Sequence, residues 1–395
     1  MAIEERVLIA GAGPVGLTAA ASLVHAGVPV TVFEAGPDLS EESRASTFHP
    51  PTLDMLDRLG AAGPLIASGL VAPRFQYRTK TQGVLAQFDF AAIADATTHP
   101  YRVQCEQSRL TRILYEQLRS NPNFELQFDS PVRQVAQQPA GVELTIEHDG
   151  RAETRSGRWL IGADGARSDV RRTLGIEFPG FTWPERFLVV STPFDFRTVI
   201  PDLAAVSYVC DLERWHFLLQ IPGLCRVMFP IAPHESDELA VSGEFAQSLM
   251  AGVVRGISRY EVVHITLYKV HQRVAQTFRE GRAFLVGDAA HINNPLGGMG
   301  MNGGIHDAVN LTSRLIDVWH GTKAESELER YDRQRRLVTL EYIEKQSIQN
   351  KRNLESDGSE FARSLAEIAA DKQRAYDYLL RVSMIASLRR AQELG

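Results

Sequence analysis

The feature that most constrains the fold is a glycine-rich turn between a short apolar strand and a helix near the N-terminus. The segment Arg6–Ala10 (RVLIA) is a short apolar run, which is typical of a strand buried on both faces. Gly11-Ala-Gly-Pro-Val-Gly16 follows directly, and Leu17–His25 then has the small residues of a closely packed helix. A second strand, Val28–Phe33, ends at Glu34. This order predicts a dinucleotide-binding βαβ unit.

The glycines of this turn and the acidic residue after the second strand have separate expected roles. Gly11 makes the turn, Gly13 lets a pyrophosphate approach the backbone, and Gly16 lets the helix pack on the strand. Glu34 can accept hydrogen bonds from ribose hydroxyls, which favours FAD or NAD over NADP. The predicted pyrophosphate loop consists of Gly11, Gly13, Pro14, Val15 and Gly16.

Two later turns also follow buried strands. Arg158–Ile161 is closed by a turn that contains Asp164 and Gly165, and Ala283–Val286 is closed by Gly287 and Asp288. Asp288 is a carboxylate at a strand end, where it can accept hydrogen bonds from ligand hydroxyls. Both turns are therefore predicted to contact a ligand.

A glycine-rich loop follows the second of these turns. It contains Pro295 and the sequence Gly297-Gly-Met-Gly-Met-Asn302, and a helix is predicted over Ile305–Trp319. Glycines let backbone approach a flat ligand closely. The first free N–H groups of the helix would point into the loop and favour negative charge there.

Composition limits the class of protein. The chain has 395 residues, of which 44% are hydrophobic and 23% charged, so two domains or one domain with a large insertion are expected. The net charge of -6 and the absence of a basic block argue against a nucleic-acid partner and an anionic membrane. The acidic N-terminus does not look like a signal peptide, and a soluble cytoplasmic protein is expected. The three cysteines, Cys105, Cys210 and Cys225, are expected to be small buried residues, with no metal site.

Patterning outside the turns suggests a second unit. Arg74–Phe90 is typical of two strands, and Phe187–Val270 is rich in strands with one helix near Phe245–Val253. Strands over Phe124–Phe128, Val132–Gln137 and Val142–Glu147 are expected to form one group, and Ser108 is expected to cap a helix.

The three ligand turns in this order resemble the group A flavoprotein aromatic hydroxylases, the p-hydroxybenzoate hydroxylase-like family, over residue 6 to about residue 320. The resemblance implies an α/β fold, with a Rossmann-like FAD-binding domain, an inserted mixed β-sheet substrate domain and a helical C-terminus. The expected FAD-binding domain is discontinuous and comprises residues 1–73, 101–180 and 272–320. Residues 74–100 and 181–271 would form the substrate domain, and residues 321–395 the C-terminal helices.

The resemblance also implies the cofactors and the reaction. One FAD is expected, with NADH or NADPH as a transient reductant because no second dinucleotide fingerprint occurs, and molecular oxygen as co-substrate. The implied reaction is hydroxylation of a small activated aromatic or heteroaromatic, phenol-like substrate through a flavin C4a-hydroperoxide. A monomer or homodimer without integral membrane association is expected.

Residue roles carried over from the family extend the predicted FAD site. Glu34 would bind the ribose, Arg44 would lie near the cofactor, and Gln107 would lie at the flavin side. Asp164 would serve both FAD and the reduced nicotinamide, and Asp288 the ribityl chain. The residues expected to flank the isoalloxazine are Pro295, Gly298, Gly300, Met301 and Asn302. A helix start at Gly300 would stabilise negative charge on the reduced flavin.

The substrate is expected under a lid formed by Arg74–Phe90 and the Phe187–Val270 sheet, facing Pro295–Met301. A flat ring with polar edges needs apolar walls and a few placed polar groups. Tyr77, Tyr208 and His216 are the expected substrate contacts, and His216 or His49 would be the base that removes a phenol proton. Ordinary packing of the tyrosines, and a satisfied or exposed position for either histidine, are the alternatives.

Two other functions fit part of the sequence. A flavin-dependent halogenase would share the nucleotide turn, but the segment from Trp215 to Pro222 lacks the second tryptophan and the spacing of the halogenase motif, and Lys80 has no glycine-rich setting. A non-catalytic FAD-binding protein would also share the turn. It would not show faster loss of flavin colour with NAD(P)H when phenols are added.

Overall fold

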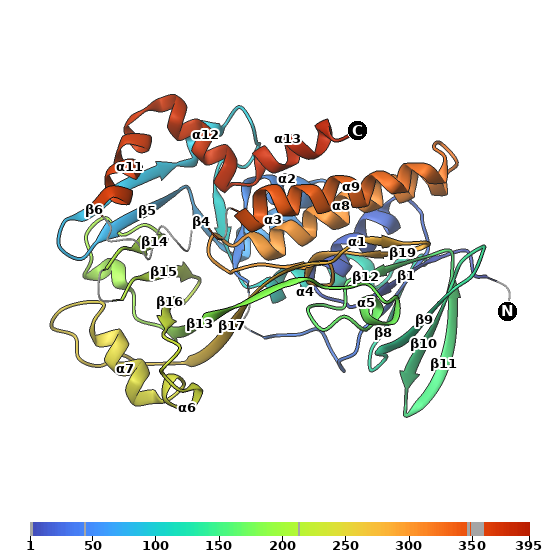
Figure 1. Cartoon of the computed structure of the whole chain (residues 1–395), viewed down its shortest axis with the longest axis horizontal. Coiled ribbons are helices and arrows are strands. Elements are labelled where there is room, and N and C mark those ends of the chain that lie inside the picture. The colour runs from blue at the N-terminus through green and yellow to red at the C-terminus, as the bar shows by residue number, and fades with distance from the viewer. Residues whose placement is uncertain (1–2, 43–44, 212–213, 346–347, 349–358) are drawn as a thin grey trace.

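The computed structural model describes residues 3–42, 45–211, 214–345, 348 and 359–395 (Figure 1). A six-stranded sheet, in the order β18-β19-β12-β1-β2-β8, forms the nucleotide-binding part. Its strands are β1 (Val7–Ala10), β2 (Val30–Phe33), β8 (Phe124–Gln127), β12 (Trp159–Gly162), β18 (Arg279–Glu280) and β19 (Ala283–Leu285). All pairs are parallel except β18 with β19. Because β1, β2, β12 and β19 are buried along their whole length, their sequences are apolar without alternation.

Helices cover this sheet, and two of them begin earlier than the sequence predicts. Helix α1 (Pro14–His25) packs against α8 (Met299–Trp319) and α4 (Gln107–Leu118). Helix α1 begins at Pro14 because the fixed φ of proline suits the first turn. Helix α8 begins six residues before the predicted Ile305, since its glycines serve packing rather than turn formation. A Cβ on Gly304 would lie 2.6 Å from Cγ2 of Val15.

The expectation that Ser108 caps a helix is wrong. Helix α4 already begins at Gln107, and its N-cap is Glu106, whose side chain makes no capping hydrogen bond. The backbone N–H of Gln107 instead donates to the carbonyl oxygen of Ala45, at 3.1 Å. A tertiary contact therefore replaces the local cap that the sequence suggested.

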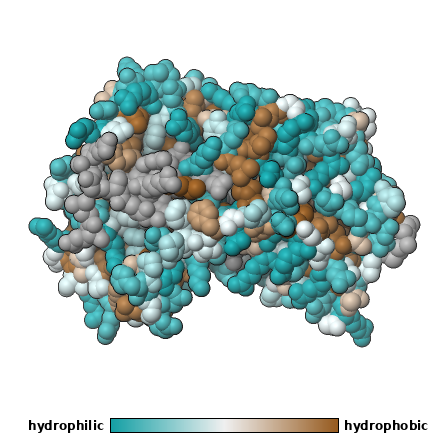
Figure 2. Space-filling view, viewed as in Figure 1, coloured by the Kyte–Doolittle hydropathy of each residue, from teal (hydrophilic) through white to brown (hydrophobic). Residues whose placement is uncertain are grey.

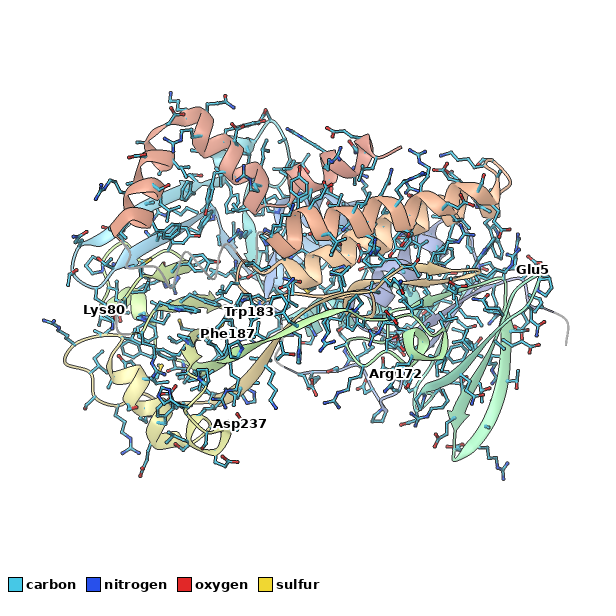
Figure 3. The ribbon with its side chains drawn as sticks, in the orientation of Figure 1. Glu5, Lys80, Arg172, Trp183, Phe187 and Asp237 are labelled. Atoms are coloured by element: carbon cyan, nitrogen blue, oxygen red, sulfur yellow. The ribbon has the colours of Figure 1, made fainter. Side chains whose placement is uncertain are left out.

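An eight-stranded sheet, in the order β20-β17-β13-β16-β15-β14-β5-β6, forms the second part. Its strands are β5 (Arg74–Thr79), β6 (Gly83–Asp89), β13 (Gly180–Thr192), β14 (Val206–Val209), β15 (His216–Ile221), β16 (Leu224–Ile231), β17 (His264–Val274) and β20 (His291–Ile292). Only β5 and β14 pair in parallel. Trp183 and Phe187 project from the long strand β13 near the middle of the molecule (Figure 3).

The two faces of the eight-stranded sheet have different covers. One face packs against the C-terminal helices through a cluster that includes Tyr77, Tyr208 and Leu379. The other face packs against α6 (Asp237–Ala240) and α7 (Gly243–Ala251) through a cluster that includes Val209, Leu218 and Phe229. Alternation along each strand therefore decides which side chains can reach a pocket under the C-terminal helices.

Two three-stranded sheets complete the strands. One contains β9 (Val132–Gln137), β10 (Val142–His148) and β11 (Arg151–Gly157), and the other contains β3 (Thr47–Phe48), β4 (Leu70–Ala72) and β7 (Arg102–Gln104). The expected single group of strands from Phe124 to Glu147 is wrong, because β8 joins the six-stranded sheet while β9 and β10 pair with β11. The other short helices before α8 are α2 (Pro50–Asp57), α3 (Ala62–Ser68), α5 (Asp169–Thr173), η1 (Phe90–Ile93), η2 (Phe196–Thr198) and η3 (Gly287–Ala289).

After α8 the described chain is helical, as the sequence predicts. The elements are η4 (Glu325–Leu328), α9 (Glu329–Val338), the π-helical segment η5 (Thr339–Glu344), α11 (Ser359–Ala370), α12 (Lys372–Val382) and α13 (Ile385–Glu393). Helices α11 and α12 lie over β5 and β6, and α13 packs against α9 (Figure 1). The face shown in Figure 2 is mostly hydrophilic, with apolar residues in patches. None of the helices in the described part of the chain could cross a membrane.

Candidate active site

The first glycine-rich turn is shaped for close approach of a ligand. Gly11 has φ of +98°, and a Cβ there would lie 2.5 Å from the carbonyl oxygen of Ala163. A Cβ on Gly16 would lie 2.0 Å from the carbonyl oxygen of Gly11, so this glycine is required by packing. A Cβ on Gly13, in contrast, would meet no atom within 4 Å. Gly13 therefore faces open space beside the first turn of α1, which no side chain caps.

Glu34 is fixed at the end of β2 by the turn itself. Its carboxylate accepts hydrogen bonds from the backbone N–H of Ala12, at 2.7 Å, and of Gly36, at 3.0 Å. A carboxylate has about four lone-pair sites, so two such bonds leave acceptor capacity. The geometry thus holds a carboxylate where a bound nucleotide could meet it.

The Asp164 turn is built around α5. The Asp164 carboxylate accepts from the Ser168 hydroxyl at 2.5 Å and from the backbone N–H of Val170 at 3.0 Å, and burial raises its pKa. Arg171, which is buried, donates to the carbonyl oxygens of Ala166 at 3.0 Å and Ala289 at 2.8 Å. One guanidinium therefore ties the Asp164 turn to the Asp288 turn.

The Asp288 turn is held from below by a buried ion pair. Oδ2 of Asp307 accepts from the backbone N–H of Gly287 at 3.1 Å and lies 2.8 Å from Nε2 of His291, while Oδ1 accepts from Nε of Arg335 at 2.7 Å. Burial raises the pKa of Asp307, but Arg335 and His291 outweigh burial and the pKa is lowered. Asp288 itself is exposed, whereas its neighbours Gly287 and Ala289 are buried. The buried neighbours therefore fix the backbone from which the Asp288 side chain projects to the surface.

The loop after this turn is joined to the N-terminal part by Asn302. Its Oδ1 accepts from the backbone N–H of His49 at 2.9 Å, and its Nδ2 donates to the carbonyl oxygens of Thr47 at 2.8 Å and Gly298 at 2.7 Å. Gly298, with φ of +66°, is the N-cap of α8 and has no side-chain cap. Gly300, Met301 and Asn302 thus lie in the first turn of α8, and the helix starts at Met299 rather than at Gly300.

Four buried polar atoms in or near this loop lack a hydrogen-bond partner among the described residues. They are His49 Nδ1, Gln104 Nε2, Asn293 Oδ1 and Asn294 Nδ2. Buried polar groups are nearly always paired, so such a cluster calls for a ligand or water. An isoalloxazine ring has donors and acceptors along one edge. Together with the open space at Gly13 and the exposed carboxylate of Asp288, these atoms fit a bound FAD.

His49 supports the loop. Its Nε2 lies 2.8 Å from the carbonyl oxygen of Gly297, which can only accept, so Nε2 carries the hydrogen of a neutral ring. Burial, with a smaller contribution from Arg102, lowers the pKa of His49 well below its ordinary value. A ring held in this way favours a positioning role for His49 over a role as base.

Tyr77 and Tyr208 meet beside the glycine-rich loop. They are paired across β5 and β14, and their rings stack with centroids 5.0 Å apart. Together they line a pocket of about 10 Å³, about the room that one water molecule needs. The other lining residues are Phe75, Arg102, Gly297, Met299, Tyr378 and Val382.

His216 lies on the opposite face of the sheet, which corrects the expectation that it contacts the same substrate as Tyr208. Tyr208 is paired with Phe217, and its ring lies 5.7 Å from the Phe217 ring. The His216 ring lies 5.6 Å from Phe229, within the cluster under α6 and α7, and burial lowers its pKa to about 4. The period of two along β15 separates His216 from the pocket.

Three further residues were expected at the FAD site: Arg44, Gln107 and Pro295. Arg44 lies outside the residues that the structure describes. Gln107 is half-buried at the start of α4, and Pro295 is exposed on the loop before Gly297. The residues that sequence patterning missed are Arg102, Tyr378, Asp307 and Arg335. Arg102 is the first residue of the short strand β7 (RVQ), and no sequence signal distinguishes it from an exposed arginine.

Comparisons with known proteins agree with this site. Residues 4–346 match the family model described as an FAD binding domain. The chain is 36% identical over 365 residues to 6-hydroxy-3-succinoylpyridine 3-monooxygenase of Pseudomonas putida, covering 90% of each protein. It is 35% identical to para-nitrophenol 4-monooxygenase of a Pseudomonas species, covering 85% of this chain and 84% of that protein.

A solved structure gives the same result. The crystal structure of p-nitrophenol 4-monooxygenase from Pseudomonas putida superposes with a TM-score of 0.92 at 30% identity, covering 98% of this chain and 99% of that one. The predicted α/β fold is confirmed, and the similarities favour an aromatic hydroxylase over a halogenase or a non-catalytic FAD-binding protein. The cofactors are FAD, a reduced nicotinamide and oxygen. The chain therefore belongs to the FAD-binding-domain family and is a group A flavoprotein aromatic hydroxylase.

Proposed function

We propose that the substrate is a small phenol-like aromatic or heteroaromatic, hydroxylated in the pocket between Tyr208 and the loop at Gly297. The observation that carries the proposal is that Tyr208 and Gly297 line the same pocket. Gly297 belongs to the loop that follows the Asp288 turn, so the pocket lies beside the proposed FAD site. Aromatic walls from Phe75 and Tyr77, with placed hydroxyl groups, suit a flat ring with a polar edge. A nitrophenol and a hydroxylated pyridine, the substrates in the names of the two relatives, have that form.

The FAD site that we propose combines the Gly11–Gly16 turn, the Asp288 turn and the first turn of α8. The first turn, from Gly11 to Gly16, would hold the pyrophosphate, with Glu34 on the ribose. Asp288 would accept hydrogen bonds from the ribityl hydroxyls, and the first turn of α8 would face the ring. Free N–H groups at the start of a helix favour negative charge, so this turn would stabilise a reduced, anionic ring.

FAD, once bound and reduced, supplies the activation of oxygen. The chain supplies orientation and exclusion of water. Tyr378 and Val382 of α12 line the pocket, which has room for about one water molecule. A ring needs far more room than one water molecule, so entry of substrate would require α12 or these side chains to move. Closing over the ring would then keep water away from the reacting atoms.

Several finer assignments also belong to this proposal. The FAD-binding part would comprise residues 1–73, 101–180 and 272–320, and the substrate part residues 74–100 and 181–271. Strand β20 (His291–Ile292) extends the sheet of the substrate part from within the FAD-binding range. We also propose a cytoplasmic enzyme, active as a monomer or homodimer, in which NADH or NADPH binds transiently without a domain of its own.

The test is substrate-stimulated oxidation of the reduced nicotinamide by the FAD-loaded protein. We would compare NADH with NADPH, each with 4-nitrophenol, 4-hydroxybenzoate and 6-hydroxynicotinate, under labelled molecular oxygen. We expect at least one ring to accelerate nicotinamide oxidation and to gain one labelled oxygen atom. Label that comes from water instead, or no acceleration by any ring, would overturn the proposal.

A further inference from the structure

Arg102 is a buried cation that has no carboxylate partner among the described residues. It is 3% exposed on β7, and its Nη2 donates to the carbonyl oxygen of Val382 at 3.3 Å. Its Nε has no partner. Buried charges are normally paired, because removing a charge from water is costly. Because no carboxylate of the described residues pairs with Arg102, its charge is suited to an anionic ligand.

Aromatic rings hold this guanidinium in position. Its Cζ atom lies 4.8 Å from the ring centroid of Phe75 and 5.1 Å from that of Phe90. Such contacts stabilise a cation, but they leave its N–H groups without a strong acceptor. Arg102 lines the pocket together with Gly297 and Met299. An anion bound to Arg102 would therefore lie beside the loop assigned to the flavin ring.

The same pocket offers no side chain that is ready to take a phenol proton. Burial raises the pKa of Tyr77 and Tyr208, and it raises the pKa of Tyr378 to about 12. These hydroxyls stay protonated at neutral pH and can donate. His49 is the nearby imidazole, but burial lowers its pKa and it does not line the pocket. The described pocket residues thus suit a phenolate better than a neutral phenol that must be ionised in place.

We propose that Arg102 binds an anionic oxygen of the aromatic substrate, and that phenolic substrates bind as the phenolate. The inference rests on the proposed function and names its substrate class, which is acidic phenols and rings with a carboxylate. Tyr208, which lines the same pocket as Arg102, would donate to the same oxygen. The charge on a phenolate oxygen also makes the ring a better nucleophile toward an electrophilic oxygen atom.

The first experiment uses the unaltered FAD-loaded protein. Dissociation constants for 4-nitrophenol, 4-cyanophenol and 4-chlorophenol, in order of falling acidity, would be measured from flavin absorbance changes between about pH 6 and about pH 10. We expect affinity to rise with pH around a midpoint that follows each phenol's own acidity. A midpoint shared by all three phenols would mean that a group of the enzyme ionises them, and would overturn the proposal. 4-Hydroxybenzoate, whose carboxylate is already ionised, would show whether a carboxylate can also provide the anion.

The second experiment removes the cation. Arg102→Met should weaken binding of 4-nitrophenolate, or of 4-hydroxybenzoate, by at least ~10-fold, because a charge-assisted hydrogen bond is lost. The neutral analogue 4-nitroanisole should bind within about 2-fold of its original affinity. Arg102→Lys keeps the charge but not the planar donor group, so its loss should be intermediate. Equal losses for charged and neutral probes, or no loss for either anion, would overturn the proposal.

Arg78→Met is the matched control. Arg78 is also a buried arginine, 7% exposed, and it is next to Tyr77 on β5. Its guanidinium donates to Gln76 and Pro201 instead of lining the pocket. This variant should bind every probe as the unaltered protein does. Equilibrium binding needs no turnover, so a failure of the Arg102 proposal is distinguishable from a failure of the hydroxylation test. If Arg102→Met does not fold, Arg102→Lys still tests the cation, and the pH series on the unaltered protein still tests binding as the phenolate.

Discussion

The hydroxyl oxygens of Tyr77 and Tyr378 lie 3.2 Å apart, although the two residues are separated by 301 positions in the chain. This bond joins β5 to α12 across the pocket. The bond is partly buried, and burial raises the pKa of both hydroxyls, so both remain protonated donors at neutral pH. The C-terminal helices are therefore part of the substrate site rather than an appendage to it.

Tyr378→Phe tests this link. Removing one hydroxyl leaves the other partly unpaired, so the free energy of unfolding should fall by about 1–2 kcal/mol in urea. The double variant Tyr77→Phe with Tyr378→Phe should lose less than the sum of the single losses, because neither hydroxyl is then stranded. Tyr376→Phe is the control, since its hydroxyl bonds to Asp95 at the surface, and it should change stability by less than ~0.5 kcal/mol. Additive losses in the double variant would contradict a direct bond.

Gly13→Val tests the open space in the first turn. Gly13 has φ of -70°, which any residue adopts, and a Cβ there meets no atom within 4 Å, so the folded apoprotein should tolerate valine. The branched side chain would fill the space assigned to the pyrophosphate, and FAD affinity should fall by at least ~100-fold, as measured by reconstitution. Gly63→Val, at another glycine with open space, is the control and should retain FAD. A yellow Gly13→Val protein would remove this turn from the FAD site.

Arg335→Met tests the support beneath the Asp288 turn. The Asp307 carboxylate would lose the partner that donates to Oδ1 and would be left as a buried charge, so unfolding free energy should fall by about 3–5 kcal/mol. Adding Asp307→Asn removes the stranded charge and should restore part of the stability. Arg336→Met is the neighbouring control, because its Nε donates to the carbonyl oxygen of Ala275 and its loss should cost about 1 kcal/mol. Equal effects of the two arginine variants would show that the ion pair contributes nothing special.

Buried histidines predict loss of stability in acid. Burial lowers the pKa of His216 to about 4 and of His306 to about 3, and it lowers that of His49 well below its ordinary value. Below about pH 6.5 the unfolded chain binds these protons and the folded chain does not, so stability is full above this pH and falls as the pH drops toward about 4. Three such sites give a slope of roughly 4 kcal/mol per pH unit in urea unfolding. His216→Asn should reduce this slope by about one third. His25→Asn, at an exposed site, should leave it unchanged.

Sequence patterning predicted the nucleotide-binding part well because its constraints are local. A glycine between a buried strand and a helix has few alternatives, and the four strands β1, β2, β12 and β19 of the six-stranded sheet are buried and largely apolar. The pairing of Tyr77 with Tyr208 on neighbouring strands also agrees with the expectation that both belong to one sheet. The sequence predicts a later start of α8 because Gly303 and Gly304 lower helix propensity, whereas a Cβ at Gly304 would clash with Val15 of α1.

The pocket could not be assembled from sequence for a different reason. Its residues come from β5, β7, β14, α8 and α12, and nothing local to any of them shows that they meet. The side of β15 on which His216 lies depends on register, and a sequence fixes alternation without fixing which face is inward. Arg102 was overlooked because a single arginine in a short strand normally indicates an exposed edge.

The order of strands in the eight-stranded sheet determines how late in synthesis the sheet can form. Its parallel pair joins β5 to β14, and Gln76 bonds to Ser207 across 131 positions of chain. The six-stranded sheet likewise waits for β19, which ends at Leu285, before its Asp288 turn can exist. At roughly 5–20 residues per second, synthesis from Gln76 to Ser207 takes roughly 7–26 seconds, during which the first hairpin has no partner strand. The nascent chain must therefore pass most of its synthesis with open sheet edges and without a flavin, and cofactor capture becomes one of the last events of its folding.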